Sequence, residues 1–329
     1  MAHCLQRGLR LTRGSNGLVR QRIAMTRPRA VCVKAAAKED VLLRSLSQLG
    51  EVAVLAVDGT NLVQEAATRH GTAPTATAAL GRTLLGALLM GSFRKDDEAI
   101  QVSFKGDGVL GGAFAIADTR GQVKGKVGNA LADPPLRPDG KLAVGDAVGS
   151  GVLSVVRSHP QQPVPYTGMV QIVSGEIAED LATYMAESEQ TNSALALGVA
   201  INRDCSVSAA GGYLVQVLPF CSEETLEQLE KNLTGLPSIT KLLQSGATPQ
   251  SITDLILEGI GCAGDPLTVA PKYGPCEADV LKVRMKRAVA SLGPAEVKSI
   301  IEEQGKIEVT CELCNQAYHF TEDEVMEFV

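Results

Sequence analysis

The chain has 329 residues, with 31 Lys and Arg against 37 Asp and Glu, and a formal charge of −6 at pH 7. Hydrophobic residues make up 45% of it, but only 3% are aromatic and Trp is absent, so the core must be built from aliphatic side chains. The acidic balance argues against a nucleic-acid partner.

The first 38 residues differ from the rest of the chain. They contain no Asp or Glu and nine basic residues, namely Arg7, Arg10, Arg13, Arg20, Arg22, Arg27, Arg29, Lys34 and Lys38. A basic, acid-free segment without a continuous apolar stretch is typical of an organelle import signal, and we expect import into the chloroplast, with the mitochondrion as the alternative. A basic arm that stays attached and binds nucleic acid is the other interpretation. Without the segment, 22 basic and 37 acidic residues remain, a formal charge of −15.

Residues 39–220 are predicted to form one α+β body. Residues 52–57 form an apolar, strand-like run, and 74–92 form an apolar helix. Because the helix is short and contains Arg82, we expect a buried core helix and no membrane span. Residues 100–104 and 109–117 are predicted to pair as a hairpin.

The stretch from Gln101 to Gly151 holds eleven glycines, which favours bent strands and tight turns over long helices. Residues 105–108 and 121–126 match neither a phosphate loop nor a dinucleotide fingerprint, and we interpret both as turns. Residues 175–189 are predicted to be an amphipathic helix whose carboxylates face solvent, since no nucleophile or His is paired with them.

Residues 221–265 are predicted to be a helical linker, with short helices over 222–232 and 239–243 and a third that begins at Thr248. Helices of this length depend on docking to a neighbour. Residues 266–329 should form a small C-terminal domain with helices over 279–291 and 294–304, a hairpin, and a last helix that begins with the capping box Thr321 and Glu324. So small a domain has little core, so that a metal would contribute much of its stability.

The cysteines of this small domain are the main candidates for function. Cys311-Glu312-Leu313-Cys314 lies in the predicted hairpin, and Cys276 lies upstream in the turn Tyr273-Gly274-Pro275-Cys276. Such thiols hold zinc, form a disulfide, or do both in turn, and the alternative is a pair of buried thiols. The six cysteines after residue 38 gather late in the chain, which indicates a reducing compartment and a local thiol site.

The chain resembles the heat shock protein 33 family of redox-regulated holdase chaperones from about residue 41 to its end. The strings that carry the resemblance are Lys105-Gly106-Asp107-Gly108-Val109-Leu110-Gly111-Gly112, Gly121-Gln122-Val123-Lys124-Gly125, Tyr166-Thr167-Gly168, Ser174-Gly175-Glu176-Ile177-Ala178-Glu179-Asp180-Leu181-Ala182, Ser188-Glu189-Gln190, Ala210-Gly211-Gly212-Tyr213-Leu214-Val215-Gln216-Val217-Leu218-Pro219 and Val309-Thr310-Cys311-Glu312-Leu313-Cys314-Asn315.

The resemblance implies a substrate-binding α+β domain, a helical linker and a C-terminal redox domain in which a CxC and a CxxC motif hold Zn²⁺. It implies that oxidation forms disulfides, expels zinc, unfolds the linker and uncovers apolar surface for unfolded client proteins, without ATP. The partners it implies are these clients, ATP-driven foldase chaperones downstream and a homodimer of the oxidised protein, with no nucleic acid and no membrane.

The sequence departs from the family pattern at one ligand. Cys276 matches the second cysteine of CxC, but Gly274 occupies the place of the first, so the resemblance carries over Cys276, Cys311 and Cys314 as metal-binding and redox-active residues. Cys262, His319 or water would complete the site, and Cys262 is the preferred candidate because His319 is constrained by the hairpin and is expected to pack beside Tyr318.

Without a fourth ligand, zinc should bind more weakly, and oxidation should join Cys311 to Cys314. Cys276 would then pair with Cys262 or remain a modified thiol. Cys205 and Cys221 are expected to have no role.

The leading interpretation is therefore an oxidation-activated chaperone and not an enzyme. The alternatives are a constitutive chaperone or zinc protein with a weakened switch, and a thiol-disulfide oxidoreductase that uses Cys311 and Cys314. The last is disfavoured because a thioredoxin-like CxxC would begin a helix, whereas this one is predicted in a hairpin.

Overall fold

The structure is a computed structural model that describes residues 38–94, 97–276 and 278–326. The predicted import segment, 1–38, lies outside these ranges except for Lys38. Over the described ranges, no helix has the length and apolar character that a membrane span requires.

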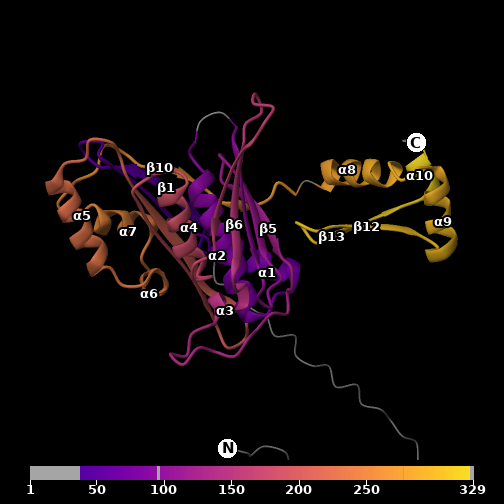
Figure 1. Ribbon diagram of the computed structural model, residues 1–329, viewed down its shortest axis with the longest axis horizontal. Coiled ribbons are helices and arrows are strands. Elements are labelled where there is room, and N and C mark those ends of the chain that lie inside the picture. Colours follow the sequence, from indigo (N-terminus) through magenta and orange to yellow (C-terminus); the bar gives the residue numbers. More distant parts are fainter. Residues whose placement is uncertain (1–37, 95–96, 277, 327–329) are drawn as a thin grey trace, which may run out of the picture. The chain divides into compact units, whose positions relative to one another are not determined.

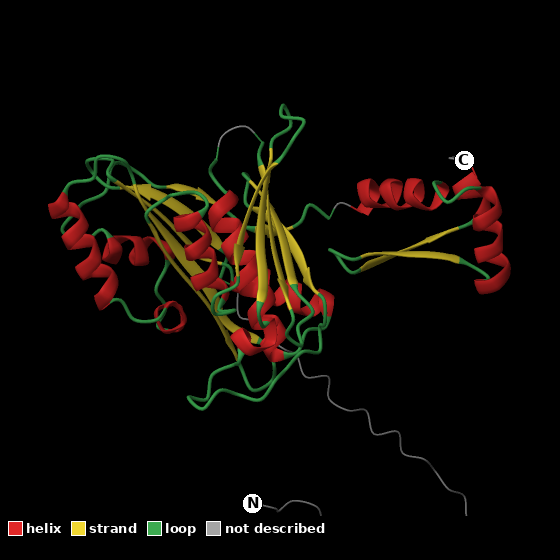
Figure 2. Ribbon diagram, in the orientation of Figure 1, coloured by secondary structure: helices red, strands yellow, loops and turns green. Residues whose placement is uncertain are grey.

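Two sheets form the body of the protein (Figures 1 and 2). The antiparallel five-stranded sheet contains, in spatial order, β10 (Leu267–Val269), β1 (Val41–Leu46), β2 (Val52–Asp58), β9 (Val207–Val217) and β8 (Ser193–Ile201). The six-stranded sheet contains β11 (Lys272–Tyr273), β5 (Gln122–Val127), β4 (Ala113–Asp118), β3 (Ala99–Gly106), β6 (Gly151–Ser158) and β7 (Tyr166–Gln171), and its strands are antiparallel except that β11 runs parallel to β5.

Helix α2 (Pro74–Gly91) lies between the two sheets and contacts strands of both. Nearly all its residues are buried, as the apolar sequence predicted, and Arg82 reaches the rim, where it pairs with Glu176. A Cβ atom at Gly81 would lie 2.6 Å from Val63, so the helix needs glycine to approach its neighbour α1 (Thr60–His70). Helices α3 (Val144–Val148) and α4 (Ile177–Glu187) also pack against α2.

The glycine-rich region contains a strand where a turn was predicted. The hairpin prediction is confirmed, since β3 and β4 pair with Ile100 opposite Ala117. The interpretation of 121–126 as a turn is wrong, because only Gly121 turns and residues from Gln122 onward form β5. A Cβ atom at Gly125 would lie 2.2 Å from the carbonyl oxygen of Phe114 on β4, so this glycine allows the close approach of the neighbouring strand and does not mark a turn. Residues 105–106 likewise belong to β3.

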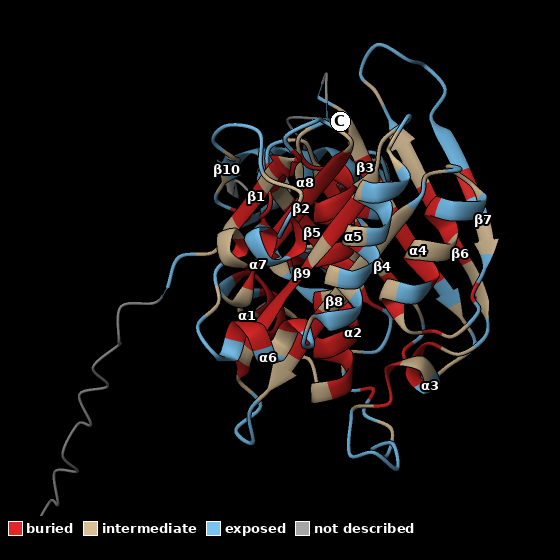
Figure 3. Ribbon diagram, turned by 90° about the vertical axis from the view of Figure 1, so that its left-hand side faces the viewer, coloured by how far each residue is buried: buried red, intermediate tan, exposed pale blue. Residues whose placement is uncertain are grey.

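The three predicted linker helices are present as α5 (Glu223–Gly235), α6 (Ile239–Gln244) and α7 (Pro249–Ile256). They pack on the face of the five-stranded sheet that points away from α2 (Figure 3). This contact has an apolar cluster of its own, to which the sheet contributes Val52, Val54, Ala209 and Val215 and the linker contributes Leu229, Ile239, Leu242, Leu243, Ile252, Ile256 and Leu257.

The small C-terminal domain consists of α8 (Ala278–Ala290), α9 (Pro294–Gln304), β12 (Ile307–Cys311), β13 (Gln316–Phe320) and α10 (Glu322–Met326) around a third apolar cluster. Its predicted capping box is confirmed, since the Thr321 backbone N–H donates to Glu324 Oε2 at 3.1 Å and the Glu324 N–H donates to Thr321 Oγ1 at 3.3 Å. The predicted domain began at residue 266, but residues 267–269 and 272–273 pair with the sheets of the body as β10 and β11.

We expect Ile252→Ala to loosen the linker. Ile252 is 0% exposed between α7 and the sheet, and removing such a side chain costs about 2–5 kcal/mol. Amide hydrogen exchange should therefore rise across 222–260. The control is Leu255→Ala on the same helix, at a side chain that is 40% exposed. Equal exchange in the two variants would contradict the packing described.

Candidate thiol site

The CxxC segment forms the turn of the β12–β13 hairpin. Cys311 is the last residue of β12, and its carbonyl accepts hydrogen bonds from the N–H groups of Cys314 at 3.2 Å and Asn315 at 2.7 Å. Asn315 has a φ of 50°, which its short polar side chain tolerates, and it closes the turn before β13 begins. The local sequence therefore places both sulfurs on one tight turn.

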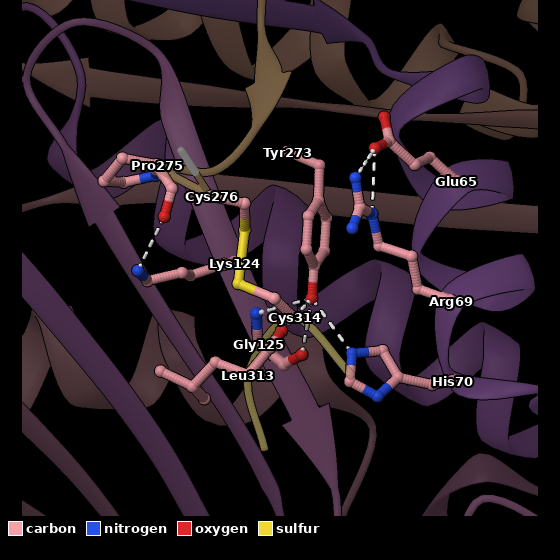
Figure 4. The surroundings of a disulfide bond; sticks show 10 residues. All are labelled: Glu65, Arg69, His70, Lys124, Gly125, Tyr273, Pro275, Cys276, Leu313 and Cys314. Carbon is pink, nitrogen blue, oxygen red and sulfur yellow. Dashed lines mark hydrogen bonds and ion pairs between the residues drawn. A yellow bond between two sulfur atoms is a disulfide. The ribbon is translucent and has the colours of Figure 1, made fainter. Parts of the chain in front are cut away.

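Cys276 reaches this turn from the body. It follows β11 by three residues and forms a disulfide with Cys314, with 6.5 Å between the two Cα atoms (Figure 4). The sequence instead predicted a Cys311–Cys314 disulfide and a bond or a modification elsewhere for Cys276. Cys311 is a free, buried thiol in the apolar cluster of the small domain. Proximity along the chain therefore does not decide which sulfurs pair in this structure.

His319 lies on the opposite face of the hairpin from Cys311. Side chains alternate along a strand, and in β13 Tyr318 and Phe320 are buried whereas His319 is exposed. Its Nδ1 lies 3.4 Å from Glu308, the residue opposite it on β12. The expectation that His319 packs beside Tyr318 is not met, because neighbouring strand residues point to opposite faces.

Cys262 lies in the segment that precedes β10, on the side of this strand away from Cys276. It forms a β-bridge with Ser47, and the flanking backbone bonds to β1 and the turn after it, since Gln48 N–H donates to Gly261 at 3.0 Å and Ala263 N–H to Leu46 at 2.9 Å. The chain then runs along β1 as β10 before it reaches Cys276. Cys262 is an exposed, free thiol at this position. Elsewhere in the chain, Cys205 is also an exposed free thiol, and Cys221 is a partly buried one.

The donor set fits zinc only in part. Three thiols suit the chemistry of zinc, but structural zinc sites use four donors. No cluster of three or more His, Cys, Asp or Glu with metal-binding geometry occurs within 38–94, 97–276 and 278–326. The described residues therefore offer sulfur ligands without a closed tetrahedral site.

Tyr273 joins the hairpin turn to the body. Its hydroxyl lies 2.9 Å from the carbonyl oxygen of Gly125 on β5 and 3.0 Å from Nε2 of His70 on α1, and it also donates to the carbonyl of Leu313 between the two cysteines (Figure 4). Burial raises the pKa of Tyr273 to about 12, so the phenol keeps its proton and remains a donor.

Arg69 covers the ring of the same tyrosine. Its guanidinium carbon lies 5.1 Å from the ring centroid, and Glu65 one turn earlier on α1 holds the guanidinium at 2.6 Å. A cation over an aromatic face is attracted by the ring quadrupole. The end of α1 thus fixes both the ring and the hydroxyl of Tyr273.

Polar contacts on either side complete the docking of the turn. Lys126 of β5 pairs with Glu312, and the Asn315 amide donates to the backbone carbonyl of Arg69. On the same strand β5, the Lys124 ammonium donates to the carbonyl of Pro275 at 2.9 Å. Burial lowers the pKa of Lys124. The turn therefore contacts both α1 and β5.

Sequence reasoning found the three cysteines and missed their surroundings. Tyr273 stood in the recognised Tyr-Gly-Pro-Cys segment, but nothing in a single sequence pairs it with His70, about 200 positions away. Lys124 and Lys126 lay in the segment interpreted as a turn, which hid their position on a strand.

Three comparisons with known proteins find relatives of the same kind. The family model described as "Hsp33 protein" matches residues 40–321. The "33 kDa chaperonin" of Desulforamulus reducens is 40% identical over 88% of this chain and 97% of its own, and that of Geobacter sulfurreducens is 41% identical over 87% and 93%. The crystal structure of the 33 kDa chaperonin from Thermotoga maritima aligns with a TM-score of 0.80 and 35% identity, covering 88% of this chain and 98% of that one.

We expect acid to destabilise the docked turn through His70. Burial, with Arg69 and Lys126 adding to it, holds the pKa of His70 below its usual 6.5, although hydrogen bonds to Leu313 and Gly125 oppose the shift. As the pH falls below 6.5, the undocked imidazole therefore binds protons first, and stability is lost down to the folded-state pKa.

The thermal midpoint of the small domain should fall between about pH 8 and about pH 5.5, and His70→Gln should reduce that fall. His159→Gln, which changes a histidine outside the thiol site, is the control. An unchanged pH dependence in His70→Gln would contradict this expectation.

Proposed function

Because the chain belongs to the Hsp33 family and is a chaperone, we propose that it is an ATP-independent holdase activated by thiol oxidation. The observation that carries the proposal is the bond between Cys276 and Cys314. It connects the segment that leaves the body with the hairpin of the small domain. Forming or breaking this bond changes the constraint on that domain.

The thiols have the properties that such a sensor needs. They lie in a small domain whose cluster contains few large side chains, so a covalent or metal crosslink contributes much of its stability. Zinc bound by Cys276, Cys311 and Cys314 would keep these sulfurs as thiolates and add folding free energy. With three protein donors, we propose weaker binding than in a four-ligand site.

In the proposed mechanism, the linker helices are the elements that change conformation. Helices α6 and α7 have six and eight residues, too few to be stable in water without packing. If they leave the sheet, the apolar side chains of Val52, Val54 and Val215 become exposed together. A contiguous apolar patch of this kind binds the exposed apolar segments of unfolded proteins.

One extended segment connects the linker with the thiols. After α7 the chain bonds to β1 near Leu46, continues beside β1 as β10, and enters the other sheet as β11 just before Cys276. Helix α7 also packs against β1 and β2. Strand β10, which precedes Cys276 in the chain, and helix α7 of the linker both contact β1. We propose that a change at Cys276 is transmitted to the linker through this shared contact.

A thiol-disulfide oxidoreductase is a weaker candidate. Its attacking sulfur must meet a substrate disulfide, but Cys311 is 8% exposed and Cys314 is 1% exposed. The CxxC turn connects two strands and does not begin a helix, which is where a thioredoxin-like CxxC would lie. We therefore propose no enzymatic activity for this site.

We propose that clients pass to ATP-driven foldase chaperones and that the oxidised protein forms a homodimer. We also propose that residues 1–38 direct import into the chloroplast, with the mitochondrion as the alternative. The family match begins only at residue 40, and the preceding segment is basic and free of acidic residues. Import is tested by following a fluorescent protein fused to 1–38.

Peroxide-treated protein should suppress aggregation of a heat-unfolded client more strongly than reduced protein. Cys276→Ser and Cys314→Ser should abolish this difference, because either removes the bond on which the proposal depends. Cys205→Ser, at an exposed thiol outside the site, should retain it. Equal protection by the oxidised and reduced wild type would leave a constitutive chaperone, and no protection in either state would refute the holdase.

Zinc content per chain should fall in Cys276→Ser, Cys311→Ser and Cys314→Ser. It should remain at the wild-type level in Cys262→Ser and His319→Ala, because neither side chain lies with the three thiols. The reduced full-length protein should be assayed by metal analysis after removal of loosely bound ions. Loss of zinc in either of the last two variants would identify a fourth ligand that this structure does not bring to the site.

A further inference from the structure

Cys276 and Cys311 are competing partners for Cys314. Cys311 and Cys314 are three residues apart, whereas Cys276 is 38 residues from Cys314. From sequence separation alone, the nearer pair is expected, since the entropic cost of bringing two residues together rises with the length of the loop between them. The structure nevertheless joins Cys276 to Cys314. Something must hold the turn beside Cys276.

The body provides that contact at one place. The elements of the small domain pack among themselves around their own cluster, while Cys276 packs against both this cluster and the main core. Tyr273 belongs to the main core and bonds to Leu313, the neighbour of Cys314. Its hydroxyl is held in turn by Gly125 and His70.

Cys311 is the unpaired thiol of the turn. It ends β12 on the face that carries Ile307, and like Cys314 it belongs to the apolar cluster of the small domain. Its carbonyl also accepts both backbone bonds of the turn. The turn thus leaves Cys311 as a free thiol, whereas Cys314 is bonded to Cys276.

We propose that Tyr273 is a positioning residue: by docking the Glu312–Asn315 turn on α1 and β5, it selects the Cys276–Cys314 disulfide over Cys311–Cys314. The inference deepens the proposed function and rests on it, because it assigns the body a part in the thiol switch. Lys126 and Glu312 add a charge pair to the same docking contact.

Hydrogen peroxide is the oxidant of this step. The thiolate of Cys276, the most accessible of the three cysteines, attacks one peroxide oxygen, which gives a sulfenic acid and releases hydroxide. The thiolate of Cys314 then attacks the sulfenic sulfur, the S–S bond forms, and a second hydroxide leaves. The two hydroxides take up the two thiol protons as water, and the two sulfurs together give two electrons to the peroxide.

The test is the disulfide map of the full-length protein after reduction, metal removal and peroxide treatment. Digestion without reductant and mass spectrometry give the ratio of Cys276–Cys314 to Cys311–Cys314 peptides. Tyr273→Phe should lower this ratio by about fivefold or more, the factor that one ordinary hydrogen bond represents. Tyr318→Phe is the matched control, because the buried Tyr318 hydroxyl has no hydrogen-bond partner among the described residues.

A charge exchange tests the docking without altering the tyrosine, and it decides the matter if Tyr273→Phe does not fold. Lys126→Glu should lower the same ratio, because it places two carboxylates together, and adding Glu312→Lys should restore it. Ratios that equal the wild type in Tyr273→Phe and in Lys126→Glu would overturn the proposal. A Lys126→Glu change that Glu312→Lys does not rescue would also count against it.

The map contains no client protein, so its result is independent of chaperone activity. A shifted ratio in a protein that never suppresses aggregation would retain Tyr273 as the positioning residue and reject the proposed function. An unshifted ratio in a protein that is activated by oxidation would reject the positioning role alone.

Discussion

The burial of α2 between two sheets is the constraint from which the body is built. A helix that meets a sheet on each side must be apolar around its whole circumference, and its glycines let the neighbouring elements approach closely. With α2 covering the inner faces, the outer face of the five-stranded sheet needs a separate cover. The linker helices α5 to α7 provide it through a second apolar cluster. The contact of α2 with the two sheets lies within the body. The contact of α5 to α7 with the outer face depends on short helices that need this packing to be stable.

This division suits a chaperone of the Hsp33 family. Under the proposed mechanism, the body would keep its own core after the linker leaves, because the two apolar clusters are separate. The segment from Gly261 to Cys276 connects the linker with the thiol site. It pairs with β1 as β10 and with β5 as β11. Its position gives the thiol pair a mechanical connection to the linker that neither domain alone would have.

The thiol site shows where sequence patterns are strong and where they fail. The CxxC spacing and the turn at Tyr273 identified the three sulfurs, because such local spacing is set by backbone geometry. The preferred fourth ligand, Cys262, was chosen for its distance along the chain, yet the β-bridge to Ser47 holds it at the far end of β10. His319 was chosen for its closeness to the turn, yet strand alternation points it toward Glu308. Nearness in sequence does not measure nearness in space once strands are paired.

The sequence by itself determined the α+β body, the apolar core helix, the short linker helices, the hairpin with its thiols and the capping box at Thr321, because periodicity, spacing and capping act within a few residues. Only the tertiary structure decided that residues 122–127 are a strand, that residues 267–273 join the sheets of the body, and that Cys276 bonds to Cys314. These depend on contacts between distant segments. Tyr273 meets His70, Gly125 and Leu313 only after both sheets have formed, and no local pattern encodes that meeting.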